Sequence, residues 1–600
     1  MGRGMACSLA RRGVQLKVFD VRPEACEEVV KLGATRAANP RECAEGVSVL
    51  IVAVLNAQQV SSVLFDGPDA ALANFQGVCV VCATVAPGFI EDIAAKASGL
   101  GTTVVDAPMS GGTVRAGKGD LTFMVSACAP AMEKCRSVLE AMGKVFLVGE
   151  KPGLGSSMKM VNQVLAGVHI AVAAEAMALA AKMGFDTRQV YDIITTCGGN
   201  SFMFENRVPH MLDDDPTPHS ALDIWPKDLG IVLDECRRLG FPCPMAGQAL
   251  QQFLAGKAMG LGSKDDSFVV KVYEALAGVT TAACEGHVVK RQRTNESAPV
   301  LHKEDCLRVG FLGLGAMGRG MACSLARRGV QLKVFDVRPE ACEEVVKLGA
   351  TRAASPRECA EGVSVLIVAV LNAQQVSSVL FDGPDAALAN FQGVCVVCAT
   401  VAPGFIEDIA AKASGLGTTV VDAPMSGGTV RAGKGDLTFM VSACAPAMEK
   451  CRSVLEAMGK VFLVGEKPGL GSSMKMVNQV LAGVHIAVAA EAMALAAKAG
   501  LDTRQVYDII TTAAGNSFMF ENRVPHMLDD DPTPHSALDI WPKDLGIVLD
   551  ECKRLGFPCP MAGQALQQFL AGKAMGLGSK DDSFVVKVYE ALAGMRVKSA

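Results

Sequence analysis

The stretch VGFLGLGAMGRG, residues 309–320, decides how the rest of the sequence is interpreted. It begins as a short apolar run typical of a buried strand. It then passes through G-x-G-x-x-G at Gly313, Gly315 and Gly318 and continues with helical spacing. Asp336 follows at the end of the next β-rich run, QLKVFD. A strand, a glycine turn, a helix and an acid at about twenty residues' distance together predict a dinucleotide-binding βαβ unit.

This stretch occurs once, whereas almost everything after it occurs twice. Residues 317–594 repeat residues 1–278 at a constant offset of 316. The repeats differ at six pairs of positions: Asn39/Ser355, Met183/Ala499, Phe185/Leu501, Cys197/Ala513, Gly198/Ala514 and Arg237/Lys553. The chain is therefore a tandem duplication. Copy 1 (residues 1–278) lacks the opening strand and the first two fingerprint glycines that copy 2 (residues 308–594) contains.

Length and composition indicate a multidomain globular protein. A chain of 600 residues is too long for one core, and two copies of a two-domain unit fit its length. The net charge of −5 is small, so neither nucleic acid nor a membrane surface is an expected partner. The longest apolar run, near residues 479–497, contains His485 and Glu491 and predicts a buried helix rather than a membrane span.

The 21 cysteines are scattered singly along the chain. One C-x-x-C occurs per copy, Cys79/Cys82 and Cys395/Cys398, inside the strand-like run VCVVCA. Residues three apart on a strand point to opposite faces, so these pairs are poorly placed to share a metal or a disulfide. We expect reduced core cysteines in a reducing compartment, and no metal site.

The order of apolar runs in copy 2 predicts the fold class. Continuous runs at SVLIVAV, VCVVCA and TTVVDAP alternate with helical segments, which indicates a parallel sheet covered on both faces. Further strands are expected at residues 437–443 and 461–465. From Ser472 to Lys498 the sequence predicts one long helix, followed by helices at residues 503–511, 540–555 and 561–574. The expected fold is an α/β Rossmann-like parallel sheet domain plus an all-α C-terminal domain, duplicated in tandem.

This pattern predicts five segments. They are a truncated NAD-binding domain (1–150), a helical domain (151–278), a linker (279–307), a complete NAD-binding domain (308–466) and a second helical domain (467–594). The linker contains KRQR at residues 290–293, for which a solvated linker is favoured over a nuclear signal. The cleft between a sheet domain and a helical domain is the expected meeting place of substrate and cofactor.

The glycine turn of copy 2, including Leu314 and Met317, is expected to bind a pyrophosphate through the amides of the helix N-terminus. Asp336 would accept hydrogen bonds from the adenosine ribose diol and repel a 2′-phosphate, which favours NAD over NADP. Arg338, two residues on, can soften that preference. A glycine turn that binds nothing is the alternative.

Three further motifs contain residues that can bind a substrate or take part in catalysis, and the first two are these. In DAPMSGG, residues 422–428, Ser426 and the amides of Gly427 and Gly428 form a donor cluster suited to a carboxylate, or simply a tight turn. In GLGSSMKMVNQ, residues 469–479, Lys475 and Asn478 share one face of the long helix.

Oxidation of an alcohol by hydride transfer needs a base for the hydroxyl proton. A lysine whose pKa is lowered by burial can be that base, although a lysine on an apolar helix more often extends to water. In WPKDLG, residues 541–546, Lys543 either approaches the cofactor from the helical domain or lies exposed at a helix start.

In order and spacing these motifs resemble the β-hydroxyacid dehydrogenases, the family of 3-hydroxyisobutyrate dehydrogenase and tartronate semialdehyde reductase, over nearly the whole of both copies. The resemblance implies that Lys475 is the catalytic acid/base. It implies that the substrate is held by Ser426, Gly427, Gly428 and Asn478. It further implies that Thr400, in CATVAP, lies near the nicotinamide ribose and that Lys543 lies near the nicotinamide.

Three long runs of copy 2, at residues 478–498, 515–528 and 536–546, are similar to the branch of that family that acts on L-threonate. The resemblance implies NAD-dependent oxidation of a short hydroxy acid at C2 to the 2-oxo acid. Activity on 3-hydroxyisobutyrate, or reduction of tartronate semialdehyde or glyoxylate, is the alternative. Trp541-Pro542 departs from the Phe-Val or similar expected before Lys543, and this change can reshape the nicotinamide edge of the pocket.

Copy 1 carries counterparts of most of these residues. They are Asp20, Thr84, Ser110, Gly111, Gly112, Lys159, Asn162 and Lys227, but only Gly2 of the three fingerprint glycines. The missing strand is expected at the centre of the sheet, so that its loss leaves two neighbours unpaired and a slot in the core.

Two explanations of copy 1 stay open. It is a non-catalytic scaffold whose helical domain pairs with that of copy 2 in an intramolecular pseudo-dimer or homo-oligomer, or Met1 is a misplaced start and both copies are complete. No targeting peptide is visible, and a cytoplasmic location is expected. Organelle targeting stays open because Met1 aligns with Met317, in the middle of the glycine turn.

Overall fold

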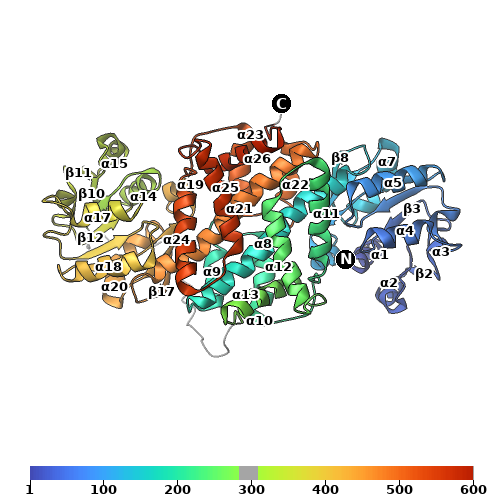
Figure 1. Ribbon diagram of the computed structural model, residues 1–600, viewed down its shortest axis with the longest axis horizontal. Coiled ribbons are helices and arrows are strands. Elements are labelled where there is room, and N and C mark those ends of the chain that lie inside the picture. Colours follow the sequence, from blue (N-terminus) through green and yellow to red (C-terminus); the bar gives the residue numbers. More distant parts are fainter. Residues whose placement is uncertain (283–307, 599–600) are drawn as a thin grey trace.

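The computed structural model describes residues 1–282 and 308–598. Figure 1 shows a sheet region at each end of the molecule, copy 1 in blue and copy 2 in yellow-green, with the helices of both copies between them. Most of the predicted linker, including KRQR, lies outside the described residues.

The sheet of copy 2 has nine strands in the order β11-β10-β9-β12-β13-β14-β16-β15, with β17 beside β16. The strands are β9 (Arg308–Leu312), β10 (Gln331–Phe335), β11 (Thr351–Arg352), β12 (Val365–Val368), β13 (Val394–Val397), β14 (Thr419–Asp422), β15 (Met425–Ser426), β16 (Leu437–Ser442) and β17 (Gly459–Gly465). From β11 to β14 all neighbours are parallel, as the continuous apolar runs predicted. The sheet turns antiparallel where β16 meets β14 and β15.

Helices cover both faces of this sheet, which confirms the sequence-based expectation. They are α14 (Ala316–Arg327), η4 (Pro339–Cys342), α15 (Glu343–Lys347), α16 (Pro356–Ala360), α17 (Ala373–Phe381), α18 (Pro403–Ser414), α19 (Gly428–Lys434) and α20 (Ala445–Glu456). One core joins Phe311 and Ile367 to the α14 side, and another joins Leu366 and Val368 to the α17 side. Alternate residues of each buried strand therefore serve two cores, as a doubly covered sheet requires.

The sheet of copy 1 is split in two, as the loss of a central strand predicted. Its strands are β1 (Lys17–Val18), β2 (Thr35–Arg36), β3 (Val49–Val52), β4 (Val78–Val81), β5 (Thr103–Asp106), β6 (Met109–Ser110), β7 (Leu121–Ser126) and β8 (Gly143–Gly149). The pair β1-β2 forms its own sheet, separate from the order β3-β4-β5-β7-β6 with β8 beside β7. In copy 2, β9 joins the corresponding strands β10 and β12.

The side chains of β3 are less buried than those of its counterpart β12, which has β9 as a neighbour. Val49 and Ile51 are only partly buried, whereas their counterparts Val365 and Ile367 are fully buried under β9 and its helix. The helices of this region correspond to those of copy 2, except that the short η2 has no counterpart there. They are α1 (Gly2–Arg11), η1 (Pro23–Cys26), α2 (Glu27–Lys31), α3 (Pro40–Ala44), α4 (Ala57–Phe65), η2 (Ala71–Ala73), α5 (Pro87–Ser98), α6 (Gly112–Lys118) and α7 (Ala129–Glu140).

The helical region of copy 2 is built around one long helix, as predicted. Its members are α21 (Leu470–Lys498), α22 (Thr503–Ile510), α23 (Phe518–Asp529), α24 (Ile540–Leu555), α25 (Pro560–Ala574), η5 (Asp582–Val585) and α26 (Val586–Ala593). The counterparts in copy 1 are α8 (Leu154–Lys182), α9 (Thr187–Ile194), α10 (Phe202–Asp213), α11 (Ile224–Leu239), α12 (Pro244–Ala258), η3 (Asp266–Val269) and α13 (Val270–Ala277). The sequence had not predicted α23 or α26.

The long helices α8 and α21 pack on each other at the centre of the molecule, and both copies contribute to one continuous hydrophobic core (Figure 1). The rings of His169 and His485 meet there with centroids 4.3 Å apart. By length and composition both helices could span a membrane, yet 94% of the most apolar window of each is buried inside the protein. They are therefore core helices, as His485 and Glu491 within the run predicted.

Two buried glutamates tie the copies together beside this crossing. Glu175 of α8 accepts hydrogen bonds from the amides of Met561 and Ala562 at the start of α25, at 2.9 and 3.0 Å. Glu491 of α21 makes the reciprocal bonds to the start of α12 in copy 1. Burial raises the pKa of each glutamate to about 7, against the opposing effect of these hydrogen bonds.

Candidate functional site

The glycine turn of copy 2 connects β9 to α14 in a conformation that only glycines allow. Gly313 has φ +94°, and a Cβ there would lie 2.7 Å from the carbonyl oxygen of Ala369. At Gly318 a Cβ would lie 2.0 Å from the carbonyl oxygen of Gly313, so the helix can start this close to the strand only without a side chain. Gly315 faces open space, where a phosphate can approach the backbone.

Asp336 lies at the end of β10 beside this turn. Its carboxylate accepts the amide of Leu314 at 2.7 Å and the amide of Arg338 at 2.9 Å. A carboxylate has about four acceptor positions, so two hydroxyl groups of a ribose can still be bound. The turn, the helix N-terminus and this acid fit a dinucleotide in the arrangement that the sequence predicted.

The same corner of copy 1 is incomplete. Asp20 accepts the amide of Arg22 at 2.9 Å, but copy 1 has no counterpart of Leu314 to donate the second bond. The Asp20 side chain is 41% exposed, whereas that of Asp336 is 8% exposed. The residues that fit a dinucleotide in copy 2 are thus only partly present in copy 1.

Lys475 lies near the start of α21 and is buried, with 7% of its surface exposed. Burial lowers the pKa of its ammonium group to about 8, while the charge of Asp544 opposes that effect. The first turn of α21 is fixed to the sheet by Asp422, at the end of β14, which accepts the Ser472 amide at 2.7 Å and the Ser472 hydroxyl at 2.8 Å. This anchor sets where Lys475, one turn later, meets the sheet.

A chain of hydrogen bonds runs from Asn478 on α21 to α24 and to the backbone of Thr400. Asn478 Nδ2 donates to Gln479 Oε1 at 2.8 Å, and Gln479 Nε2 donates to Asp544 Oδ2 at 2.6 Å. Asp544 pairs with Lys543, whose Nζ donates to the carbonyl oxygen of Thr400 at 3.0 Å. The predicted substrate residue Asn478 and the predicted cofactor residues Lys543 and Thr400 are thereby parts of one network.

The predicted donor cluster lies between β15 and α19. Ser426 ends β15, and Gly427 and Gly428 lead into α19 with φ of +137° and +74°. Ser426 is buried, and its hydroxyl oxygen accepts a hydrogen bond from the amide of Gly198, 2.9 Å away in copy 1. The predicted substrate residue Ser426 of copy 2 is therefore in direct contact with a residue of the other copy.

The counterparts in copy 1 repeat this geometry. Lys159 is 7% exposed with a pKa lowered by burial to about 8. Asn162, Gln163 and Asp228 form the same chain of hydrogen bonds, and Lys227 donates to the carbonyl oxygen of Thr84 at 3.1 Å. Ser110 accepts from the amide of Ala514 in copy 2, and Gly111 and Gly112 lead into α6.

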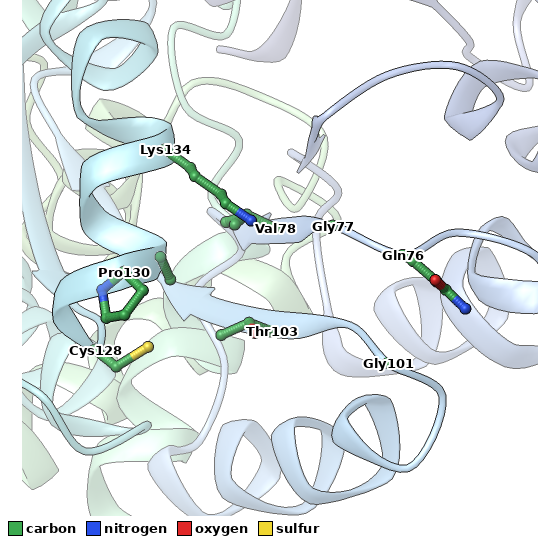
Figure 2. Close-up of a pocket in the computed structure, with 9 residues that line it drawn as sticks. Gln76, Gly77, Val78, Gly101, Thr103, Cys128, Pro130 and Lys134 are labelled. Atoms are coloured by element: carbon green, nitrogen blue, oxygen red, sulfur yellow. The ribbon is translucent and has the colours of Figure 1, made fainter.

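Two cavities of copy 1 lie at opposite edges of its sheet. A cavity of about 280 Å³ lies beside α11 and is lined by Thr84 and Lys227, among others. It coincides with the place expected for the nicotinamide. The shallow cavity of Figure 2, about 170 Å³, lies where β4 and β5 begin, with the Lys134 side chain pointing toward Val78. Ligands of doubly wound sheets bind at the carboxyl ends of the strands, so this second cavity is on the wrong edge for the cofactor.

Sequence reasoning missed three groups of site residues. Asp422, in DAPMSGG, was given no role, because it binds the start of α21 from 50 residues away and such a tertiary contact has no local sequence signal. Gln479 and Asp544 directly follow Asn478 and Lys543, and only the structure shows that they join the two. The hydrogen bond from the Gly198 amide of copy 1 to Ser426 of copy 2 could not be predicted from the sequence of either copy alone.

Comparison with known proteins agrees with this geometry. The family model for the NAD-binding domain of 6-phosphogluconate dehydrogenase matches residues 1–149 and 308–465. The model for the NAD-binding region of NADP-dependent 3-hydroxyisobutyrate dehydrogenase matches residues 153–273 and 469–589. Together the two models match most of both copies.

Individual relatives each cover one copy. An L-threonate dehydrogenase of Cupriavidus necator is 46% identical over 47% of this chain and 95% of its own length. The L-threonate dehydrogenase of Escherichia coli K12 is 45% identical over 48% of this chain and 97% of its own length. A crystal structure of 3-hydroxyisobutyrate dehydrogenase from Salmonella typhimurium is 44% identical, covering 47% of this chain and 99% of that chain, with a TM-score of 0.46.

The matched families bind NAD and oxidise or reduce hydroxy acids, which are small molecules. The predicted fold class, enzyme class and cofactor are thereby confirmed. The chain belongs to the β-hydroxyacid dehydrogenase family of NAD-dependent oxidoreductases, as two tandem copies of a 3-hydroxyisobutyrate dehydrogenase-like unit.

Proposed function

We propose that copy 2 oxidises L-threonate at C2 to the 2-oxo acid, with Lys475 as the acid/base. The observation that carries this proposal is the burial of the Lys475 amine beside the network of Asn478, Asp544 and Lys543. The substrate follows from the relatives named L-threonate dehydrogenase, at 46% and 45% identity.

The chemistry of Lys475 follows from its surroundings. With a pKa of about 8, roughly a tenth of its amines are neutral at pH 7, compared with fewer than one in a thousand at the ordinary value of 10.5. A neutral amine takes the proton of the substrate hydroxyl during oxidation, and the ammonium form returns it during reduction. NAD, when bound, supplies the hydride acceptor.

The other predicted residues of copy 2 hold the reactants. The Ser426 hydroxyl and the amides of Gly427 and Gly428 donate to the substrate carboxylate. Asn478, whose orientation is fixed by Gln479, donates to a substrate oxygen. Asp336 and the glycine turn, with Leu314 and Met317, bind the adenosine and pyrophosphate portions, and Lys543 and Thr400 border the nicotinamide.

Copy 1 is proposed to act mainly as a scaffold, although its amine Lys159 is present. The exposed Asp20 and the split sheet of residues 1–282 support this assignment. The predicted domain division, assembly into homo-oligomers and a cytoplasmic location stay predictions. Lys159, Ser110, Asn162, Thr84 and Lys227 then form a vestigial site.

A substrate panel tests the function. The full chain is assayed in both directions: oxidation of L-threonate, 3-hydroxyisobutyrate and glycerate with NAD and with NADP, and reduction of tartronate semialdehyde and glyoxylate. We expect the highest kcat/KM for L-threonate with NAD, because Asp336 disfavours a 2′-phosphate. A higher kcat/KM for another acid or aldehyde would replace the proposed substrate, and absence of activity on all of them would overturn the proposed reaction.

A further inference from the structure

The loop after the first short helix of each helical region reaches the other copy. In copy 1 this exchange loop covers residues 195–201, after α9, and in copy 2 residues 511–517, after α22. The two loops pair with each other: the amide of Phe202 donates to Asn516 at 3.0 Å, and the amide of Phe518 donates to Asn200 at 3.1 Å. Each loop also binds the sheet of the other copy: Thr438 Oγ1 donates to the carbonyl oxygen of Thr196, and Thr122 Oγ1 donates to that of Thr512, both at 3.1 Å.

The exchange loop of copy 1 contacts the substrate residues of copy 2 through its backbone. The amide of Gly198 donates to Ser426 Oγ at 2.9 Å, and the amide of Gly199 donates to Asn478 Oδ1 at 3.0 Å. The carbonyl oxygen of Thr196 accepts from Arg431 at 2.9 Å, and so fixes the loop to α19.

These bonds decide which atoms of the substrate residues remain available. A hydroxyl has one donor and two acceptor positions, so Ser426, having accepted from Gly198, still has its proton to donate. The Asn478 oxygen accepts from Gly199 and its nitrogen donates to Gln479, which leaves one N–H of the amide unassigned. Both side chains therefore present donors, which is what a substrate carboxylate or hydroxyl requires.

Two of the six differences between the copies lie in this loop. Copy 2's substrate site receives Cys197 and Gly198, whereas copy 1's site receives Ala513 and Ala514. Cys197 is buried, 1% exposed, and close enough to Lys475 for the charge of that lysine to lower its pKa against the larger effect of burial. A Cβ at Gly198 would lie 2.8 Å from the Met519 methyl, so this site leaves more room for Met519 than its counterpart does.

We propose that residues 197–199 of copy 1 are positioning residues for the substrate site of copy 2, so that copy 1 serves copy 2 in trans. This inference rests on the proposed function, since it assigns the contacts of the same site. It also makes the two sites of the chain chemically unequal, although their side chains Lys, Ser and Asn are the same.

A crossed pair of substitutions tests the inference. A Cβ at Gly199 would lie 3.0 Å from each of three atoms of α21: the carbonyl oxygen of Asn478, Oδ1 of Asn478 and Cβ of Leu481. Gly199→Ala in copy 1 therefore pushes on Asn478 in copy 2. Gly515→Ala in copy 2 is the nearest equivalent: its Cβ would lie 3.0 Å from Leu165 Cβ and 3.2 Å from the carbonyl oxygen and Oδ1 of Asn162 in copy 1. The two changes are equally conservative, and their thermal midpoints are measured to confirm that both variants fold.

Gly199→Ala is expected to lower kcat/KM for the hydroxy acid about tenfold, mainly through KM, without weakening NAD binding. The loss in Gly515→Ala is expected to be at least fivefold smaller. Equal losses, or a larger loss in Gly515→Ala, would overturn the inference. The substrate panel on the unmodified chain tests the proposed substrate on its own. The comparison of the two glycine variants tests only the contact between the copies, so the two proposals can fail independently.

If Gly199→Ala does not fold, a double substitution in the exchange loop of copy 1 tests the same inference. The double change Cys197→Ala and Gly198→Ala installs the sequence that copy 2 already carries at this turn. We expect KM for the hydroxy acid to change at least threefold. Arg237→Lys is the matched control: it is also a difference between the copies, but its side chain is 80% exposed on α11, and kcat/KM should stay unchanged. If the double variant has the same kcat and KM as Arg237→Lys, the inference is contradicted.

Discussion

The two sheet regions have nearly the same sequence but different architectures. In copy 2, β9 joins two halves of a nine-stranded sheet and carries the glycine turn, whereas in copy 1 the corresponding strands form two separate sheets. The helical regions show no such difference, because each completes its core with the other copy. The absence of a β9 counterpart from the described residues of copy 1 therefore changes the sheet but leaves the helical half, with its buried lysine, unchanged.

The largest expected effect comes from the two lysines. Lys475→Ala should lower turnover about 10²- to 10⁴-fold, because the acid/base is lost while NAD binding is retained. Steady-state rates and an NAD titration measure the two effects separately. If the copies worked equally, Lys475→Ala and Lys159→Ala would each lose half of the activity. We expect Lys159→Ala to lose less than half, and near-normal turnover in Lys475→Ala would refute the assigned role.

NAD binding sharpens the same comparison. Calorimetry is expected to find one tight NAD site per chain, because the side chain of the predicted ribose acid is 8% exposed in copy 2 (Asp336) but 41% exposed in copy 1 (Asp20). Asp336→Ala should weaken NAD binding about 10- to 100-fold, since it removes a charged hydrogen-bond acceptor. The same change at Asp20 is the matched comparison and should weaken it much less. Two sites of equal affinity would exclude the scaffold assignment.

Hydrogen exchange reports the missing strand directly. Strand β3 is paired only with β4 along the path of its sheet, whereas β12 is paired with both β9 and β13. Amides in residues 49–52 should therefore exchange at least about tenfold faster than those in residues 365–368, which have the same sequence. Peptides that include Asn39 or Ser355 differ in mass and identify the copy. Equal exchange would mean that the split sheet is closed in solution.

The pH dependence of oxidation is expected to follow the deprotonation of Lys475. Its pKa of about 8 lies below the ordinary value, and only the neutral amine accepts a proton. With one such group, kcat/KM should rise about tenfold from pH 7 to pH 9, and the reverse reaction should fall over the same range. A flat profile would point to a different base. The residual rate of Lys475→Ala, assayed over the same range, shows whether Lys159 contributes.

The smallest effect is expected at the exposed helix start of copy 1. Asn39 accepts the Glu42 amide at 2.8 Å, and Ser355 accepts the Glu358 amide at 3.1 Å in the same cap. Asn and Ser are equally good in this position, so Asn39→Ser should change the free energy of unfolding by less than about 0.5 kcal/mol. Urea denaturation measures it. A larger change would show that the copies differ in stability for reasons other than the strand.

Much of the fold follows from local patterns. The helix predicted at residues 540–555 has the bounds of α24, and the long helix begins only two residues before its predicted start. By contrast α23 was missed, because Pro525 and several charged residues interrupt its apolar period. The antiparallel direction of β16 was not predicted, since an apolar run carries no information about which way its neighbour runs.

The candidate site divides in the same way. The glycine turn and Lys475 could be found because their residue types and spacings follow from their chemistry. The burial of Lys475 was only one of two alternatives until the packing around α21 was seen. The contacts of Gly198 and Gly199 could not be predicted, because backbone amides have no residue-type signal and the partner atoms are more than 200 positions away.

Fusion into one polypeptide has a consequence for how the enzyme responds to dilution. The paired glutamates, the packed long helices and the exchange loops all join copy 1 to copy 2. Separate subunits would lose such contacts on dilution below their dissociation constant, but tethered halves remain at a fixed, high effective concentration. The thermal midpoint and specific activity of this protein should therefore not depend on the protein concentration. For an untethered pair of subunits with the same interface, both would fall on dilution.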